Sequence, residues 1–176
     1  MAAPHSLTSA TTRSGRSGQA ALEFALLAPL MLVLLLMVID FGRAIHDMQV
    51  MAGLSRQGSN LASRGTNLSS SAAAVISGDA PLDLGNNGEV IVTSVANIGS
   101  TYTITGQASQ GGTSNTSRVG TGVGNLATIP SSAATMLQPG QTIFITEIFY
   151  SYRPLTPLAN LLSIVMPSTL YEVAYF

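Results

Sequence analysis

SGQAALEFALLAPLMLVLLLMVIDFGRAI, Ser17–Ile45, is the stretch of sequence that decides the fold. Its block Phe24–Ile39 holds sixteen residues without a charge, somewhat short of the ~20 that span a bilayer core. The wider run Gln19–Gly42 is ~36 Å long as a helix, which is enough to span that core. The stretch therefore predicts a membrane-spanning helix, and Pro29 does not exclude one because proline is tolerated there.

A carboxylate, Glu23, stands immediately before this apolar block. An acid at the centre of a membrane helix costs about 2.5–3.5 kcal/mol on insertion scales, and acids in such segments usually have a function. Two plainer interpretations leave Glu23 unexplained. A secretory signal peptide would need a small-residue processing site after the apolar run, where VIDFGRAIHDM is a poor one. A signal anchor explains only the length, so a special role for Glu23 is favoured.

These residues resemble the start of a TadE-like protein, a minor pilin or pseudopilin of the tight-adherence (Flp) type IV pilus system. The pattern of that family is a small residue, four further residues, a glutamate, an aromatic residue and a long apolar helix. Gly18, Glu23 and Phe24 match it. The stretch QPGQTIFITEIFYSYRPL, Gln138–Leu155, is similar to the penultimate-strand region of the same family.

The resemblance implies a mechanism of processing and assembly. A prepilin peptidase would cut between Gly18 and Gln19, where a residue without a side chain lets the enzyme approach the backbone. Glu23 would then neutralise the N-terminal ammonium of a neighbouring subunit, with Phe24 in the same contact between helices. A carboxylate is tolerated in a medium of low dielectric when it is paired with a cation. The implied partners are the peptidase, other pilin or pseudopilin subunits and the inner membrane.

The orientation of the helix is implied by the same resemblance, with the N-terminus cytoplasmic and the C-terminal domain periplasmic in a bacterial inner membrane. Counting positive charges does not decide it, because Arg13 and Arg16 before the segment are balanced by Arg43 and Arg56 after it. Incorporation into a surface pilus and service as an assembly factor both stay open.

Length and patterning predict three parts of the chain. Residues 1–18 are a Ser/Thr/Gly-rich leader, residues 19–64 are one helix whose membrane part is about 20–41, and residues 65–176 are a small α+β domain. Gly65 is expected to end the helix, with Arg64 in the last turn.

The second half of the helix is predicted to pack on its own domain, because amphipathic surface helices commonly do. The residues expected on the packing side are Phe41, Ile45, Met48, Ala52 and Ala62. Those expected largely elsewhere are Asp40, Arg43, Asp47 and Gln57.

The domain is predicted to be a small antiparallel sheet of about four strands, pilin-like when the long helix is included. Residues 89–98 and 101–109 are expected to form a hairpin around Gly99-Ser100. Residues 141–155 are expected to form a central strand covered by the helix on one side. The remaining expectations are a linker at 66–90 with a short helix near 70–76, a flexible surface loop at 110–139, an apolar helix or loop at 157–167 and a closing strand at 168–176.

The composition argues against several classes of function. A charged share of 9% and a net charge of −1 give no electrostatic footprint for nucleic acid. The absence of cysteine excludes disulfides, thiolate metal sites and a cysteine nucleophile. His5 lies in the expected leader, and His46 next to Asp47 is not a dyad because sequence neighbours do not face each other on a helix. No enzyme activity and no cofactor are expected.

Two groups of acidic residues, at 79–89 and at Glu147, are interpreted as structural and not as functional. Residues 79–89 are rich in oxygen ligands, but their spacing does not match a calcium loop and suits ordinary turns. Glu147 is expected to be an exposed strand acid, since unpaired burial is costly, with pairing to Arg153 or Arg118 as the alternative.

The sequence therefore predicts a minor pilin or pseudopilin that contributes to assembly of a tight-adherence pilus. The alternative is an uncleaved, membrane-anchored periplasmic binding or adhesion module that uses the loop Gln110–Pro139 as its contact surface. The two interpretations differ in one feature. A pilin needs Gly18 and Glu23, whereas an anchor needs only hydrophobicity.

Overall fold

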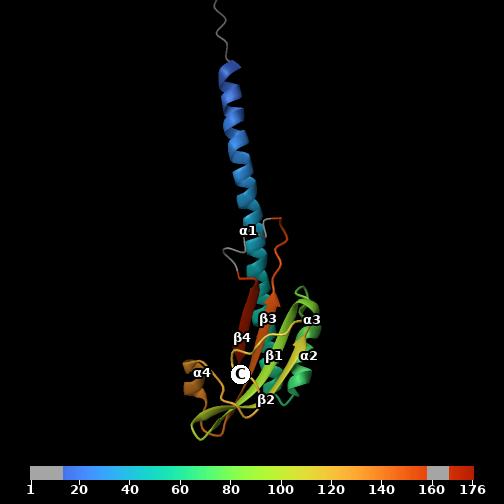
Figure 1. The fold of residues 1–176 in the computed structure, drawn as a ribbon, viewed down its shortest axis with the longest axis vertical. Coiled ribbons are helices and arrows are strands. Elements are labelled where there is room, and N and C mark those ends of the chain that lie inside the picture. Colours follow the sequence, from blue (N-terminus) through green and yellow to red (C-terminus); the bar gives the residue numbers. More distant parts are fainter. Residues whose placement is uncertain (1–13, 158–166) are drawn as a thin grey trace, which may run out of the picture.

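One long helix, α1 (Ser14–Ser63), carries a small α+β domain at its C-terminal half (Figure 1). The structure is a computed structural model that describes residues 14–157 and 167–176. α1 is rich in Leu, Ala and Met, which favour helix, and it continues through Pro29. It is roughly 75 Å long at ~1.5 Å per residue. The prediction of one continuous helix that ends near residue 63 is confirmed.

α1 ends in a Schellman motif. Gly65 has φ +89°, its N–H donates to the Ala62 carbonyl at 3.0 Å, and the Thr66 N–H donates to the Leu61 carbonyl at 3.2 Å. Glycine takes this left-handed conformation without steric cost. Arg64 follows the last helical residue and does not lie in the last turn, where the sequence had placed it.

Four antiparallel strands form one sheet in the order β2-β1-β3-β4. Their bounds are β1 Gly88–Ile98, β2 Thr101–Gly111, β3 Thr142–Ser151 and β4 Thr169–Tyr175. Gly99 and Ser100 both have positive φ, 59° and 70°, as a two-residue type I′ hairpin requires. The predicted hairpin, central strand and closing strand are confirmed.

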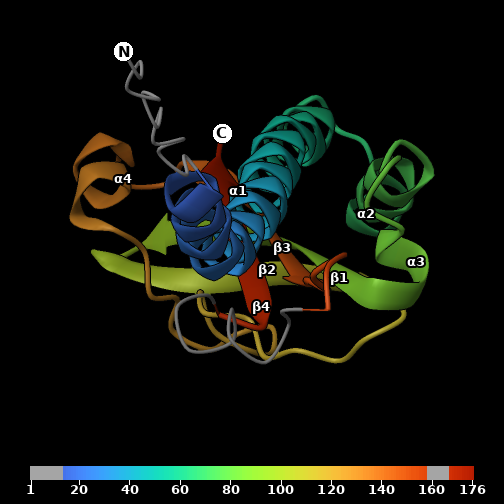
Figure 2. The ribbon, with the colours of Figure 1, turned by 90° about the horizontal axis from the view of Figure 1, so that it is seen from above.

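The sheet separates two layers (Figure 2). α1 and α2 (Leu68–Ser77) cover one face. The segment 112–130 after β2, called the long segment below, crosses the other face. The larger core lies between the helices and the sheet, and the smaller one lies beneath the long segment. The larger core includes Met51, Leu54, Val75, Leu84, Val90, Val92 and Ile148, and the smaller one Val95, Ile104, Val119 and Ile145.

The predicted packing side of α1 is wrong in its main members. Phe41, Ile45 and Met48 remain exposed, at 51%, 44% and 43%. Ala62 is buried as predicted, and Ala52 is half-buried. The other residues that α1 buries are Asp40, Ala44, Asp47, Met51, Leu54, Ser55, Gly58 and Ser59. Small residues dominate this face because α1 lies close to the sheet. A Cβ added at Gly58 would stand 2.8 Å from the Thr146 Oγ1.

The linker after α1 is organised by local capping. The Asn67 side chain accepts from the Ser69 N–H at 2.8 Å and caps α2, the short helix that the sequence predicted near residues 70–76. The Asp79 carboxylate accepts from the Leu84 N–H at the start of α3 (Leu84–Asn87). Asp83 accepts from the Asn86 side chain at 2.9 Å. Within the described residues, no three His, Cys, Asp or Glu side chains gather as a metal site would require.

The loop 110–139 was predicted to be a flexible surface loop, but its segment 112–130 packs against the sheet and pairs with part of the outer edge of β2. The Ile104 N–H donates to the Asn125 carbonyl at 2.9 Å, and the Ala127 N–H donates to the Tyr102 carbonyl at 2.7 Å. α4 (Ser131–Met136) follows it. The predicted apolar element at 157–167 lies almost entirely outside the described residues.

Candidate assembly and processing site

The four residues singled out by the sequence lie on the exposed N-terminal part of α1. Gly18 and Gln19 are exposed, and Phe24 is 72% exposed. The Gln19 Nε2 donates to the Glu23 Oε1 at 3.0 Å, one helical turn away. The helix therefore brings the expected cleavage point and the expected assembly carboxylate into direct contact.

Glycine at position 18 has no packing reason in this structure. A Cβ placed there would meet nothing within 4 Å. Glycine inside a helix is less favourable than alanine by about 0.8–1 kcal/mol, so the fold would gain from a side chain. Within the described structure, a side chain at this position would therefore be accommodated without any contact.

The segment from Gly18 to Ile39, called the stalk below, is uncovered by the rest of the described chain. It contains an eighteen-residue window of mean hydropathy 2.7 in which no residue is buried. By length and composition, this helix can cross a membrane once. Its exposed large side chains include Leu22, Phe24, Leu26, Leu27, Leu30, Met31, Leu32, Leu34, Leu35, Val38 and Ile39.

Asp40 marks the point where the stalk meets the folded domain, called the head below. Its side chain is fully buried, and its Oδ1 accepts from the Leu155 N–H at 2.9 Å and the Thr156 N–H at 3.3 Å. The Thr156 hydroxyl donates to the other oxygen, and the Tyr152 hydroxyl donates to the Asp40 carbonyl at 2.8 Å. Asp40 thus ties α1 to the segment after β3.

Sequence reasoning did not find this role for Asp40. The available signal was its place as the first charged residue after the apolar block. Burial raises the pKa of Tyr152, and the nearby Asp40 charge raises it further.

Glu147 is also fully buried, which corrects the prediction of an exposed acid. Its carboxylate accepts from the Ser117 hydroxyl, from the Arg118 N–H at 2.8 Å and from the Tyr171 hydroxyl at 3.0 Å. The Arg118 guanidinium lies 3.8 Å from the centre of the Tyr171 ring. Burial, followed by the Glu147 charge and hydrogen bond, raises the pKa of Tyr171 well above its ordinary value.

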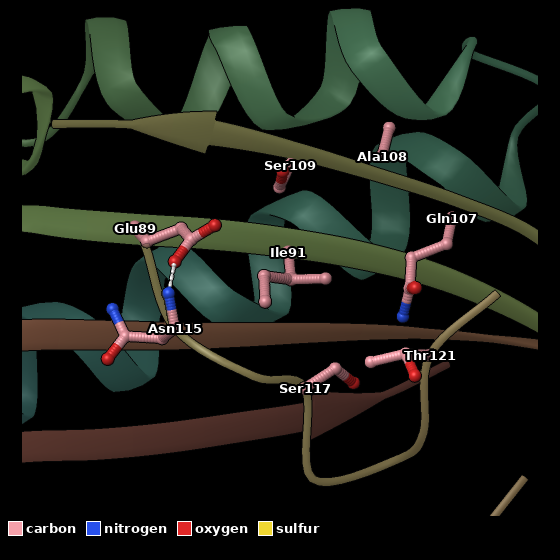
Figure 3. Close-up of a pocket in the computed structure, with 8 residues that line it drawn as sticks. All are labelled: Glu89, Ile91, Gln107, Ala108, Ser109, Asn115, Ser117 and Thr121. Atoms are coloured by element: carbon pink, nitrogen blue, oxygen red, sulfur yellow. Dashed lines mark hydrogen bonds between the residues drawn. The ribbon is translucent and has the colours of Figure 1, made fainter. Parts of the chain in front are cut away.

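A polar cavity of about 190 Å³ lies near this cluster, between β1, β2 and the segment 112–122 (Figure 3). The Glu89 carboxylate at one end accepts from the Asn115 N–H. Gln107 closes the other end, where its side chain donates to the Gly120 carbonyl at 2.9 Å. The cavity side chains thus hold the long segment in place.

The side chains of the sequence neighbours His46 and Asp47 approach each other, at a distance too long for a hydrogen bond. The Nδ1 of His46 lies 3.8 Å from the Oδ1 of Asp47. His46 is mostly exposed whereas Asp47 is buried against the head, so the contact lies at the rim of the α1 packing face. It forms an ion pair when His46 is protonated.

Together these features define a class: an α+β protein whose head stands on an uncovered apolar helix compatible with a single-pass membrane anchor. The particular family follows from comparison with known proteins. A family model described as TadE-like protein matches residues 18–60, about a quarter of the chain. This match confirms the resemblance seen in the sequence, and the chain carries a TadE-like N-terminal segment.

The matched residues contain the stalk and nearly all of the α1 packing face, but none of the sheet. No curated protein and no solved structure matches the chain.

Proposed function

We propose that the chain is a minor pilin or pseudopilin that contributes to assembly of a tight-adherence pilus, with a structural and not a catalytic role. The observation that carries the proposal is the stalk: an uncovered apolar helix of TadE-like sequence with one carboxylate, Glu23, near its start. In this proposal the helix lies in a bacterial inner membrane, with the N-terminus cytoplasmic and the head periplasmic.

Glycine 18 supports processing between Gly18 and Gln19 by a prepilin peptidase. The fold makes no use of a missing side chain there, whereas a protease that grips an extended backbone does. Cleavage would make Gln19 the first residue of the helix. It would also place an ammonium and the positive end of the helix dipole one turn from Glu23.

Glu23 supports assembly through charge pairing. Its only hydrogen-bond partner in the described structure is the Gln19 amide, and a lone carboxylate in hydrocarbon is costly. An ammonium from a neighbouring subunit offsets that cost. The acid therefore favours assembled neighbours over an isolated helix, with Phe24 and the other uncovered apolar side chains in the contact between helices.

A crosslinking experiment tests this proposal. The chain has no cysteine, so Leu27→Cys provides a single thiol one turn beyond Glu23. We expect a photoactivatable crosslinker attached to this thiol, in membranes that make the pilus, to crosslink this chain to neighbouring subunits. Glu23→Gln should lower the crosslinked fraction about fivefold or more, since it removes a charge-pairing contribution of ~1 kcal/mol or more.

Matched variants separate charge pairing from hydrophobic anchoring. Glu23→Asp keeps the charge and should retain part of the crosslinking, while Gly18→Leu should block cleavage and lower it as strongly as Glu23→Gln. Arg43→Gln, outside the stalk, should leave it unchanged. Equal crosslinking by the wild type, Glu23→Gln and Gly18→Leu would instead favour the uncleaved membrane-anchored module.

A further inference from the structure

β4 is an edge strand whose outer side is open in the described part of the chain. Phe144 and Phe176 exchange both backbone hydrogen bonds, at 2.9 Å each. In an antiparallel ladder, residues bonded to the neighbouring strand alternate with residues whose N–H and C=O groups point away. The outward-pointing residues of β4 are therefore Thr169, Tyr171, Val173 and Tyr175. Among residues 14–157 and 167–176, none forms a hydrogen bond with these backbone groups.

The two edges of the sheet are treated differently. Part of the outer edge of β2 is paired by the chain itself, through backbone bonds of Tyr102 and Ile104 to residues 124–127. β4 receives no such cover from the described chain. Open edges are usually blocked, because they invite another strand to pair. An edge without such pairing, opposite one that the chain partly pairs itself, therefore indicates a docking position.

A cavity of about 270 Å³ opens beside this edge, on the face that carries the long segment. Tyr171 and Tyr175 of β4 form one wall, and Arg118 lies over the Tyr171 ring. The remaining walls are Val119, Thr128, Ile129 and Pro130. The cavity is thus largely apolar and aromatic, with one cation at its rim.

Arg118 has no carboxylate partner for its guanidinium within the described residues. Glu147 meets Arg118 through the backbone N–H and already accepts three hydrogen bonds. All eight acids of the chain fall inside the described ranges, so no other part of the chain supplies one. A guanidinium stacked on an aromatic ring keeps its edge N–H groups available for a carboxylate.

We propose that β4 binds an extended, acidic peptide segment of another protein as a fifth strand of the sheet. The backbone of that segment pairs with the outward groups of Tyr171, Val173 and Tyr175, and alternate side chains fall over the cavity. A carboxylate at one of those positions binds Arg118, and apolar side chains at the others pack on the tyrosines. This inference does not depend on how the helix is processed.

A second copy of β4 does not fit this description. Glu172 is the only acid of β4, and it alternates with Tyr171 and Val173, so it faces the α1 side of the sheet. Pairing of two β4 strands would therefore leave both Arg118 side chains without an acid. The charge thus favours a different, acidic partner.

The test uses the full chain in phospholipid nanodiscs and synthetic heptapeptides of alternating Thr and Val with Glu, Gln or Lys at the centre. We expect the Glu peptide to bind about tenfold more tightly than the Lys peptide, and Arg118→Gln to remove that preference. Arg64→Gln, an exposed cation outside the sheet, should leave the preference intact. Equal binding of the Glu and Lys peptides, or no binding by any of them, would overturn the proposal.

A second measurement checks the mode of binding. The amides of Tyr171, Val173 and Tyr175 should gain protection from hydrogen exchange when the Glu peptide binds, while those of Glu172 and Ala174 are protected in its absence. Val173→Pro removes an outward N–H that β3 does not use and should abolish binding of all three peptides. Unchanged exchange at the three outward amides, or peptide-free dimerisation that Val173→Pro removes, would contradict the proposal.

Discussion

Asp40 and Glu147 each carry a buried carboxylate inside a group of donors from distant parts of the chain. The donors to Asp40 come from residues 155–156, and those to Glu147 come from residues 117–118 and 171. Buried charges are tolerated when hydrogen bonds replace their hydration. At the residue scale, these two acids therefore fix the segments around the sheet.

Removal of the Glu147 carboxylate should destabilise the head strongly. Glu147→Ala leaves one buried donor, the Ser117 hydroxyl, and two partly buried donors without this acceptor, which should lower the free energy of unfolding by about 3 kcal/mol. Glu172→Ala on the neighbouring strand removes a half-buried acid that makes no comparable set of bonds, and should change it by less than about 0.5 kcal/mol. Urea unfolding of the full chain in detergent, followed by circular dichroism, measures both. Similar losses in the two variants would contradict the role of Glu147.

Tyr171 should make the head sensitive to alkali. Its pKa is raised in the folded state, so its contribution to stability is complete below the unfolded pKa of ~10. That contribution is lost as pH rises above this value towards the folded pKa, at up to about 1.4 kcal/mol per pH unit. Tyr171→Phe should show a shallower loss of stability above about pH 10. An unchanged slope in Tyr171→Phe would rule out this linkage.

The sequence could not predict the burial of Glu147, because its three donors lie about 24 to 30 residues away along the chain. Local patterning showed only an acid between apolar residues of a strand. Gly18 and Glu23 could be singled out as candidates from sequence because their pattern lies within one short segment.

At the element scale, α1 serves two surroundings with one sequence. Its exposed side remains apolar past the stalk, at Phe41, Ile45 and Met48, while its packing face uses small residues and two acids. The spacing of the large apolar residues therefore marks the exposed side of α1, and the prediction of the packing side from that spacing was wrong. The hairpin and strands were predictable, since each carries its own turn residues and β-branched pattern.

Two glycines of α1 should respond in opposite ways to alanine. Gly58→Ala places a Cβ 2.8 Å from Thr146 and should lower the free energy of unfolding by about 1–3 kcal/mol. Gly53→Ala meets nothing within 4 Å and should raise it by about 0.5–1 kcal/mol. Parallel urea unfolding curves compare them. Stabilisation by Gly58→Ala would contradict the close contact between α1 and β3.

The junction of stalk and head should loosen when Asp40 loses its carboxylate. Asp40→Ala removes the carboxylate to which the Leu155 and Thr156 amides donate, so their hydrogen exchange should quicken about tenfold or more. Asp83→Ala, which removes an exposed acid from the linker, is the control and should leave both amides unchanged. Equally slow exchange in Asp40→Ala would show that the protection of these amides does not come from Asp40.

At the scale of the whole molecule, the stalk and the head differ in what they expose. The stalk is roughly 33 Å of apolar helix that the described residues leave uncovered. The head packs the C-terminal half of α1 against one face of the sheet, and no described residue pairs with the outer edge of β4. The proposed function assigns membrane insertion and subunit packing to the stalk. The head is then free to present its own contact surface.

The mature N-terminus tests this division most directly. Mass spectrometry of the protein purified from membranes, with and without the prepilin peptidase, would identify it. We predict a chain that begins at Gln19 only when the peptidase is present. A chain that keeps its residues before Gly18 in the presence of an active peptidase would contradict pilin-type processing, and a start beyond Ile39 would remove the stalk from the mature protein altogether.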